Sequence, residues 1–329
     1  MTSKNTPTNN NFRVVSLFAG IGGICMGFNS LGCKVIWAND FDPYAKVTYQ
    51  LNFPETEFNS KSITEVLATE IPDHDILTAG FPCQAFSIAG YRNGFNDYRG
   101  NLFFEIERIL NEHKNSPKAI LLENVKNLKT HDNGRTFSEI SNRLLKAGFY
   151  ITTDVLNTAE YGNIPQNRER IYIVGFRDKA VLEKFQFPKP LKLTKPINSI
   201  IDFHKKQPDF FYYNESSPYY QMLKNNINTD QTVYQIRRIY VRENKSNLCP
   251  TLTANMGTGG HNVPIIRDQF GIRKLTPREC FLFQGFPKSY KFPENLARSH
   301  LYKQAGNSVS VPVIRRIAKN MIQALDESN

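Results

Sequence analysis

Residues 16–23 read Ser-Leu-Phe-Ala-Gly-Ile-Gly-Gly, and this stretch decides the fold. It completes an apolar, β-branched run at residues 13–18 and leads into a helix-like stretch at residues 24–31. Glycines at a strand-to-helix turn let a ligand approach the main chain and leave amide groups free at the start of the helix. The pattern predicts a ligand-binding α/β turn, and a purely structural glycine turn remains the alternative.

The same alternation continues through the first half of the chain. Further strands are predicted at residues 34–38, 75–78, 119–122 and 170–176, and helices at residues 43–51, 102–112 and 135–147, the last stopped by Gly148. Strands separated by helices predict an α/β fold, a Rossmann-like, doubly wound, mostly parallel sheet covered on both faces. Ligands of such sheets bind beyond the carboxyl ends of the strands.

After Pro188 the pattern becomes irregular. A Pro/Lys-rich linker at residues 187–195 precedes three short strand candidates and a glycine-rich stretch at residues 257–260. The strand candidates lie at residues 237–242, 248–254 and 263–267. We therefore expect a first domain at residues 1–188, completed by a C-terminal helix within residues 305–329, and a second, smaller, irregular β-rich domain at residues 189–304.

Composition excludes several classes of protein. The chain has 329 residues, of which 40% are hydrophobic and 22% charged, so it is neither disordered nor fibrous. No apolar run approaches the roughly 18–20 residues of a membrane span, and residues 1–11 lack the apolar stretch of a signal peptide. Five widely spaced cysteines and six histidines form no Cys-x-x-Cys or His-x-x-x-His pair. We expect a cytoplasmic protein without a disulfide framework, a metal site or contact with a membrane.

The charge is uneven along the chain. Residues 1–159 carry 15 Lys+Arg and 16 Asp+Glu, whereas residues 160–329 carry 26 and 14. A basic second half of this kind favours binding to a polyanion, most plausibly nucleic acid. A basic surface that serves only solubility is the alternative.

Several residues with chemical potential follow the predicted strands. Asp40 lies past the second strand, where a carboxylate suits a ribose diol, and Phe41 could lie against an adenine; NAD, FAD and S-adenosylmethionine all fit. Cys83 follows a buried strand and is either an activated thiolate or a small buried hydrophobe. Glu123 ends the next strand, where a carboxylate needs a polar partner. Arg168 and Arg170 face one region, unless they are surface ion pairs.

Five motifs in order carry a resemblance to a known family. They are residues 18–23 (Phe-Ala-Gly-Ile-Gly-Gly), 80–84 (Gly-Phe-Pro-Cys-Gln), 123–125 (Glu-Asn-Val), 166–170 (Gln-Asn-Arg-Glu-Arg) and 306–309 (Gly-Asn-Ser-Val). Together they resemble the cytosine-5 DNA methyltransferases of bacterial restriction–modification systems. The resemblance covers residues 13–188 and 248–320, and it thins over residues 189–247, the variable target-recognition region of this family.

The resemblance implies S-adenosylmethionine as cofactor and no metal. Phe18 would lie against the cofactor, with Asp40 on its ribose and Phe41 beside its adenine. The implied cofactor-binding residues are Phe18, Ala19, Gly20, Ile21, Gly22, Gly23, Asp40, Phe41, Ser62, Pro82, Asn307 and Ser308. At residue 62 the family often has Asp, so the serine could accept the same hydrogen bond only without a charge.

The resemblance also implies a mechanism. Cys83 would attack C6 of a cytosine and so make C5 nucleophilic enough to take the methyl group. Glu123 would hold the N3 and N4 edge of the base, Arg168 its O2 side, and Arg170 would fix Glu123 or the adduct. The base would be flipped out of the duplex, and residues 87–99 would close over it.

Double-stranded DNA is the implied partner, bound by a monomer, and a cognate restriction endonuclease would share the site. DNA contacts are expected from Ser87, Gln235, Arg238 and Thr251, with Gln235 filling the space that the flipped base leaves. The family's arginine two residues after Cys280 is replaced by Leu282, which we expect to affect domain packing or a phosphate contact.

Three rival functions remain. A cytosine-5 methyltransferase of tRNA shares the cysteine and glutamate motifs, but the basic recognition region favours duplex DNA. A nicotinamide-dependent oxidoreductase would use only the glycine turn. A catalytically inactive DNA-binding module conflicts with the presence of Cys83, Glu123 and Arg168 together.

Overall fold

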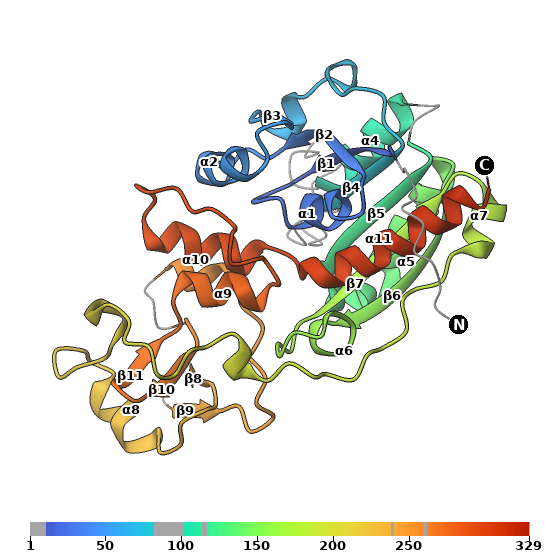
Figure 1. The fold of residues 1–329 in the computed structure, drawn as a ribbon. Coiled ribbons are helices and arrows are strands. Elements are labelled where there is room, and N and C mark those ends of the chain that lie inside the picture. The colour runs from blue at the N-terminus through green and yellow to red at the C-terminus, as the bar shows by residue number, and fades with distance from the viewer. Residues whose placement is uncertain (1–10, 82–101, 114–116, 238–239, 259–261, 329) are drawn as a thin grey trace, which may run out of the picture.

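A seven-stranded sheet forms the larger part of the computed structural model, which describes residues 11–81, 102–113, 117–237, 240–258 and 262–328 (Figure 1). Its strand order is β3-β2-β1-β4-β5-β7-β6. The strands are β1 (Arg13–Leu17), β2 (Lys34–Asn39), β3 (Glu57–Asn59), β4 (Ile76–Gly80), β5 (Ala119–Val125), β6 (Tyr150–Asn157) and β7 (Glu169–Phe176). Among these strands β7 alone runs against its neighbours, so the predicted α/β fold with a mostly parallel sheet is confirmed.

Helices cover both faces of this sheet. The helices are α1 (Gly23–Asn29), α2 (Pro43–Asn52), α4 (Leu102–Glu112), α5 (Arg135–Lys146), α6 (Thr158–Gly162) and α7 (Lys179–Lys184). Alternate residues of β1 separate the two cores: Val14 packs with α1, and Val15 packs with α4 and α5. Gly148, with φ 87°, ends α5 as expected.

The order of the strands creates the crevice in which ligands of such sheets bind. β1 lies between β2 and β4, so the chain reverses its direction of winding at β1. The turn after β1, Asp40 after β2, and the end of β4 therefore meet at one edge of the sheet. In the next pair of strands, Gly80 is in register with Glu123 of β5, which extends the same edge.

A smaller antiparallel sheet forms the second half, in the order β11-β10-β8-β9. Its strands are β8 (Tyr234–Arg237), β9 (Tyr240–Glu243), β10 (Ile265–Asp268) and β11 (Gly271–Lys274), and α8 (Tyr220–Asn226) packs on it. This confirms a smaller β-rich part beside the main sheet. The boundaries at residues 188 and 304 remain a prediction.

Several local expectations were wrong. The strand predicted at residues 237–242 belongs to two paired strands, β8 and β9. The strand predicted at residues 248–254 is irregular, with one isolated bridge between Gln166 and Cys249 and a short 3₁₀ helix at Ala254–Gly257. The edge strands β3 and β6 were missed, because the solvent-facing side of an edge strand carries polar residues and breaks the apolar run.

The C-terminal segment is two helices where one was expected from residue 305 onward. α10 (Arg298–Asn307) ends before Ser308, and α11 (Val311–Asp326) begins with Pro312 in its first turn. The preceding helix, α9 (Pro277–Phe283), has Thr276 and Glu279 as a reciprocal cap. α11 lies across the main sheet against α1, while α9 and α10 join the two sheets (Figure 1).

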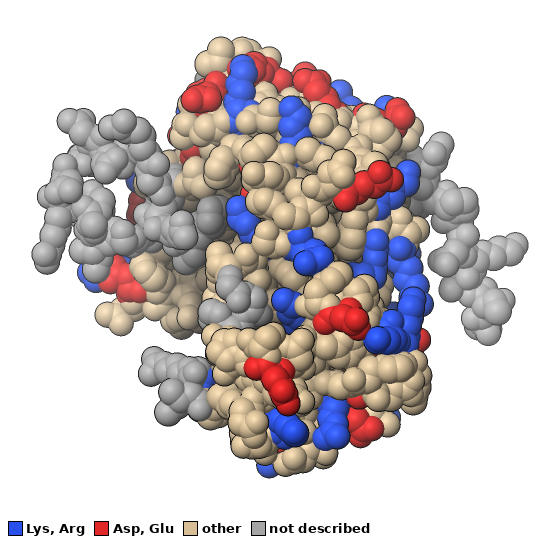
Figure 2. Space-filling model, turned by 90° about the vertical axis from the view of Figure 1, so that its left-hand side faces the viewer, with Lys and Arg blue, Asp and Glu red and all other residues tan. Residues whose placement is uncertain are grey.

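The surface charge is distributed over both parts of the molecule. Figure 2 views the side on which α2 and α8 lie in Figure 1, and Lys and Arg side chains there form several groups with Asp and Glu among them. Within the described residues, no helix is long and apolar enough to cross a membrane.

Candidate active site

The turn after β1 has the backbone that its glycines predict. Gly20 and Gly22 have φ of 53° and 80°, and Phe18 also has a positive φ, 52°. The amide of Gly20 donates to Asp40 Oδ2 at 2.8 Å, so the turn is held by the carboxylate that follows β2. Left-handed backbone favours glycine and turns the chain sharply into α1. The predicted glycine turn and Asp40 are therefore brought together.

Asp40 is placed to accept hydroxyl groups. Its Oδ1 accepts from the amide of Asp42 at 2.9 Å, so each carboxylate oxygen has one main-chain donor and a free lone pair. Burial raises the pKa of Asp40, while the amides of Asp42 and Gly20 act in the opposite direction. Phe41 beside it is 68% exposed, so one face of its ring is free to cover a ligand.

Other predicted cofactor residues vary in their surroundings. Ala19 is partly buried and Ile21 fully buried beside the turn. A Cβ on Gly23 would lie 2.7 Å from Ser308 Oγ, so Ser308 packs directly against the start of α1. Asn307 is exposed, and Ser62 is partly buried just before the 3₁₀ helix Ile63–Glu65, where its hydroxyl contacts Thr64 Oγ1 at 2.8 Å.

Glu123 and Arg170 form a largely buried ion pair at the ends of β5 and β7. Arg170 Nε lies 3.2 Å from Glu123 Oε1, and the two side chains are 15% and 10% exposed. Antiparallel pairing sets this geometry, because it places Glu123 opposite Tyr172 and Val125 opposite Arg170. The pair fits the expectation that Arg170 orients Glu123.

Asn124 is a site residue that the sequence analysis gave no role. Its Nδ2 donates to the carbonyl oxygen of Phe81 at 2.9 Å, and its Oδ1 accepts from the amide of Val125. Phe81 immediately precedes Pro82 and Cys83 in the sequence. Asn124 therefore fixes the main chain at the start of the segment that carries the predicted nucleophile. The sequence feature that could have identified Asn124 is its position between Glu123 and Val125 at the end of a strand.

Several predicted site residues lie outside the described residues: Pro82, Cys83, Ser87, Arg238 and residues 87–99.

Arg168 is 2% exposed and binds main-chain carbonyl groups. Its NH1 donates to Leu252 O at 2.8 Å, and its NH2 donates to Ser308 O and Gly306 O. Burial, followed by the charge of Arg170, lowers the pKa of Arg168 to about 9, so the group stays cationic at neutral pH. This residue therefore joins three segments, and only part of its donor set remains for a base.

Two buried polar atoms at this place have no hydrogen-bond partner among the described residues: Glu123 Oε1, an acceptor that meets Arg170 only as an ion pair, and Arg168 Nε, a donor. A buried donor or acceptor without a hydrogen bond costs about 1–3 kcal/mol. Opposite charges at Glu123 and Arg168 also influence each other electrostatically. The arrangement offers complementary partners to a ligand that has both donor and acceptor groups.

Two of the four predicted DNA contacts, Thr251 and Gln235, are described, and both lie in the second half of the chain. Thr251 Oγ1 donates to Asn167 O at 2.7 Å and keeps a free lone pair. Gln235 was expected before a strand but lies within β8, where its Oε1 accepts from Arg237. Leu282 is a partly exposed residue of α9.

Close packing explains why the 306–309 motif begins with a glycine. A Cβ there would overlap the carbonyl group of Thr253 and lie 2.5 Å from the amide nitrogen of Ala254. The motif therefore packs against the main chain at residues 253–254 as well as against α1. Sequence reasoning missed this role, since a glycine needed for close packing has no local signature.

Comparisons with known proteins give matches along nearly the whole chain. Residues 12–323 match the family described as C-5 cytosine-specific DNA methylase. The chain is 53% identical to the type II methyltransferase M.Bsp6I of Bacillus sp. (strain RFL6), over 95% of this chain and 99% of that protein. It is 43% identical to M.HaeII of Haemophilus aegyptius, over 96% and 94%.

Solved structures share the fold. A DNMT2 mutant of Spodoptera frugiperda superposes with a TM-score of 0.73 at 22% identity, over 94% of this chain and 99% of that chain. A putative DNA modification methyltransferase encoded in an E. coli prophage gives 0.67 at 21% identity, over 96% and 100%. With the strand-end motifs, the glycine turn and the matches along its length, this chain belongs to the C-5 cytosine-specific DNA methylases of the bacterial restriction–modification type.

Proposed function

We propose that this protein methylates C5 of a cytosine in double-stranded DNA, with S-adenosylmethionine as methyl donor. The observation that carries the proposal is the pair of buried atoms without hydrogen-bond partners, Glu123 Oε1 and Arg168 Nε, at the sheet edge that leads to Cys83. A cytosine offers N3, N4 and O2 along one edge, which needs both acceptors and donors from the protein.

The residues that follow β1 and β2 at the sheet edge fit the cofactor. The left-handed turn at Gly20 and Gly22 exposes main chain, Asp40 retains lone pairs for a ribose diol, and Phe41 has a free face. When bound there, S-adenosylmethionine supplies an electrophilic methyl group. Ser62, Pro82, Asn307 and Ser308 complete the proposed set.

In the proposed chemistry, the Cys83 thiolate adds to C6 of the cytosine, and the electron pair of the C5–C6 double bond becomes available at C5. Glu123 stabilises protonation at N3, which draws electrons from the ring during this addition. C5 takes the methyl group. Loss of the C5 proton to a base and departure of the thiolate from C6 then restore the double bond and free Cys83.

The arginines have different proposed tasks. Arg170 orients the Glu123 carboxylate through the 3.2 Å contact. Arg168 approaches O2 through Nε, because its other nitrogens already donate to carbonyl groups. Both positive charges stabilise electron density that develops on the base.

Access to C5 and C6 requires the base to leave the duplex. We assign closure over the flipped base to residues 87–99, and DNA contacts to Ser87, Gln235, Arg238 and Thr251. The parts proposed are a catalytic and cofactor-binding domain at residues 1–188 with residues 305–329, and a target-recognition domain at residues 189–304. The protein would act as a cytoplasmic monomer that protects host DNA from an endonuclease of the same specificity.

Bisulfite sequencing of DNA from a host expressing the chain tests this function. We expect complete modification of one cytosine in a short repeated sequence, and none with Cys83→Ser, which should retain cofactor binding. Purified protein should methylate duplex DNA and not tRNA. Modification by Cys83→Ser at the wild-type rate, or transfer to tRNA alone, would contradict the proposal.

A further inference from the structure

A cavity of about 560 Å³ lies between β11, the start of α10 and the 3₁₀ helix Ala254–Gly257. Two cationic side chains line it, Lys274 and Arg298, together with Gly257 and Tyr302. None of its described lining residues is Asp or Glu. Neither charged group has a hydrogen bond or an ion pair with another described residue. Two unpaired positive charges facing one hollow favour an anionic ligand.

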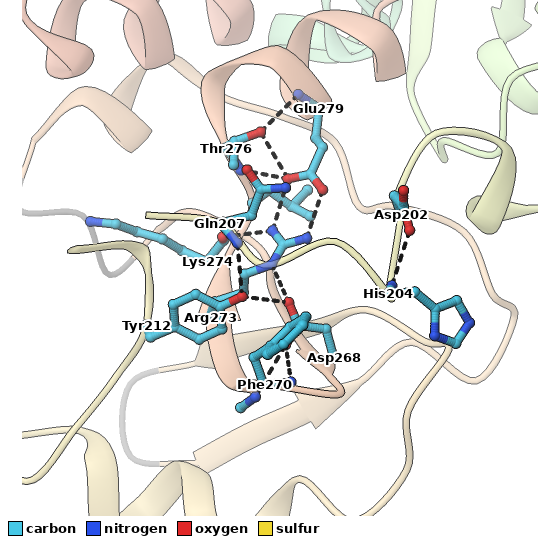
Figure 3. Close-up of polar contacts among 12 residues, drawn as sticks. Asp202, His204, Gln207, Tyr212, Asp268, Phe270, Arg273, Lys274, Thr276 and Glu279 are labelled. Carbon is cyan, nitrogen blue, oxygen red and sulfur yellow. Dashed lines mark hydrogen bonds and ion pairs between the residues drawn. The ribbon is translucent and has the colours of Figure 1, made fainter. Parts of the chain in front are cut away.

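Lys274 is directed to this cavity by the strand that carries it. Its neighbour Arg273 is fully buried and bonds to Asp268 Oδ2 at 2.7 Å and to Glu279 at 2.8 and 2.9 Å. Successive side chains of a strand point to opposite faces, so Lys274 points away from this cluster, as Figure 3 shows. The buried cluster therefore fixes the position from which the lysine extends.

The guanidinium group of Arg298 is oriented by an aromatic ring. Its guanidinium lies 3.8 Å from the centre of the Phe210 ring. Stacking on an aromatic face orients the group and leaves its in-plane N–H donors available. Burial, followed by the charge of Arg298, lowers the pKa of Lys274, so the two cations disfavour each other until an anion lies near them.

Gly257 lines the cavity and belongs to the proposed recognition region. A Cβ on Gly257 would lie 2.6 Å from Ser299 O, so the main chain packs directly on α10. Gly257 lies six residues after Thr251, a proposed DNA contact, in the half of the chain that carries the excess of Lys and Arg. An anion in the cavity would therefore lie against the main chain of this proposed recognition region.

We propose that this cavity binds a backbone phosphate of the substrate DNA through Lys274 and Arg298. The site rests on the proposed function, because it takes duplex DNA as the ligand. Its contact is independent of sequence and positions the recognition region on the duplex, whereas side chains elsewhere select the base pairs.

The test is the salt dependence of binding to a duplex that contains the methylated sequence. Wild type, Lys274→Gln, Arg298→Gln and the double variant are titrated by fluorescence anisotropy between about 50 and 200 mM KCl. Removing one phosphate interaction should reduce the slope of log affinity against log salt by about 0.9. The ratio of wild-type affinity to variant affinity should therefore fall about 3-fold between the lowest and the highest salt concentration. If both cations share one phosphate, the double variant should bind little more weakly than either single variant.

Lys179→Gln is the matched control. Lys179 is exposed on α7, 3.9 Å from Glu183, and α7 lies on the opposite side of the molecule from β11 (Figure 1). This variant should keep the wild-type slope. Thermal unfolding midpoints close to wild type would show that the two cavity variants fold.

The outcomes separate the cavity from the proposed function. Unchanged slopes in folded Lys274→Gln and Arg298→Gln, with wild-type protein that methylates the duplex, would overturn the phosphate site alone. A wild-type protein that transfers no methyl group to duplex DNA would overturn the function, whatever the slopes. Reduced slopes together with active wild-type enzyme support both.

Discussion

The two sheets of this molecule place functional groups by different means. At the edge of the seven-stranded sheet, Asp40 follows β2, and Glu123 and Arg170 form an ion pair near the ends of β5 and β7 that meet there. The four-stranded sheet is joined to the rest in part by main-chain atoms of its flanking segment. Cys249 O accepts from the amide of Asn167 at 2.8 Å, and Leu252 O accepts from Arg168.

This difference affects how the recognised DNA sequence can change. The part of the anchor that is made of carbonyl groups and a close-packed glycine depends little on the side chains of the segment that docks. The edge that we propose to be catalytic depends on particular carboxylates and guanidinium groups. We therefore expect exchange of the recognition region to be tolerated, and single changes at the catalytic edge to be costly.

Exchange of the recognition region should have the largest effect on the product. Replacing residues 189–270 with the equivalent region of a relative that recognises another sequence should move methylation entirely to that sequence, because much of the anchor, at Cys249 O and Leu252 O, is made of main-chain groups. Bisulfite sequencing gives the new site, and cofactor affinity should be unchanged. A folded chimera that still modified the original site would place recognition elsewhere, for example in residues 87–99.

Glu123→Gln should leave the chosen sequence unchanged and slow the chemistry. The amide keeps the shape of the side chain but loses the charge that pairs with Arg170 and stabilises protonation of the base. We expect methyl transfer to slow by about two orders of magnitude or more. Single-turnover kinetics measures this step. Near wild-type rates would remove Glu123 from the mechanism.

Asp40→Ala should affect the cofactor alone. It removes the acceptor of the Gly20 amide and the proposed partner of the ribose. Hydrogen bonds to charged groups are worth about 1.5–3 kcal/mol, so affinity for S-adenosylmethionine should fall about 10-fold or more. Calorimetry measures the affinity. A comparable loss of DNA affinity, with cofactor binding intact, would contradict the assignment of this half of the edge.

Gly306→Ala should mainly lower stability. The added methyl group would overlap the main chain at Thr253 and Ala254, and forced overpacking of this kind costs about 1–3 kcal/mol. Denaturant unfolding measures the change. Gly32→Ala measures backbone strain without crowding, because its φ of 85° favours glycine but a Cβ there has nothing within 4 Å. A Gly306→Ala variant as stable as wild type would mean that the close approach at Gly306 carries no particular cost.

The prediction of pH dependence follows from Asp40. Burial raises its pKa in the folded protein, so its contribution to folding is most favourable at low pH and is lost as the pH rises through the folded-state pKa. Wild type should therefore lose some stability relative to Asp40→Asn as the pH rises from about 4 to 7. Unfolding at several pH values measures this difference, and a constant difference across the range would contradict the raised pKa.

The sequence by itself determined the α/β class and the residues of the catalytic edge. Apolar periodicity and turn chemistry are local, so the glycine turn, α2, α5 and the strands β4 and β5 could all be predicted. Family motifs in order added roles for Cys83 and the arginines, and these roles remain predictions.

Only the tertiary structure decided what those residues touch. Arg168 binds carbonyl groups 84 and 140 positions away in the chain, and Gly306 meets Thr253 across the junction of the two halves. Lys274 and Arg298 likewise face one cavity although β11 and α10 are separate elements. No periodicity encodes such contacts, because they depend on how distant segments pack once both sheets have formed.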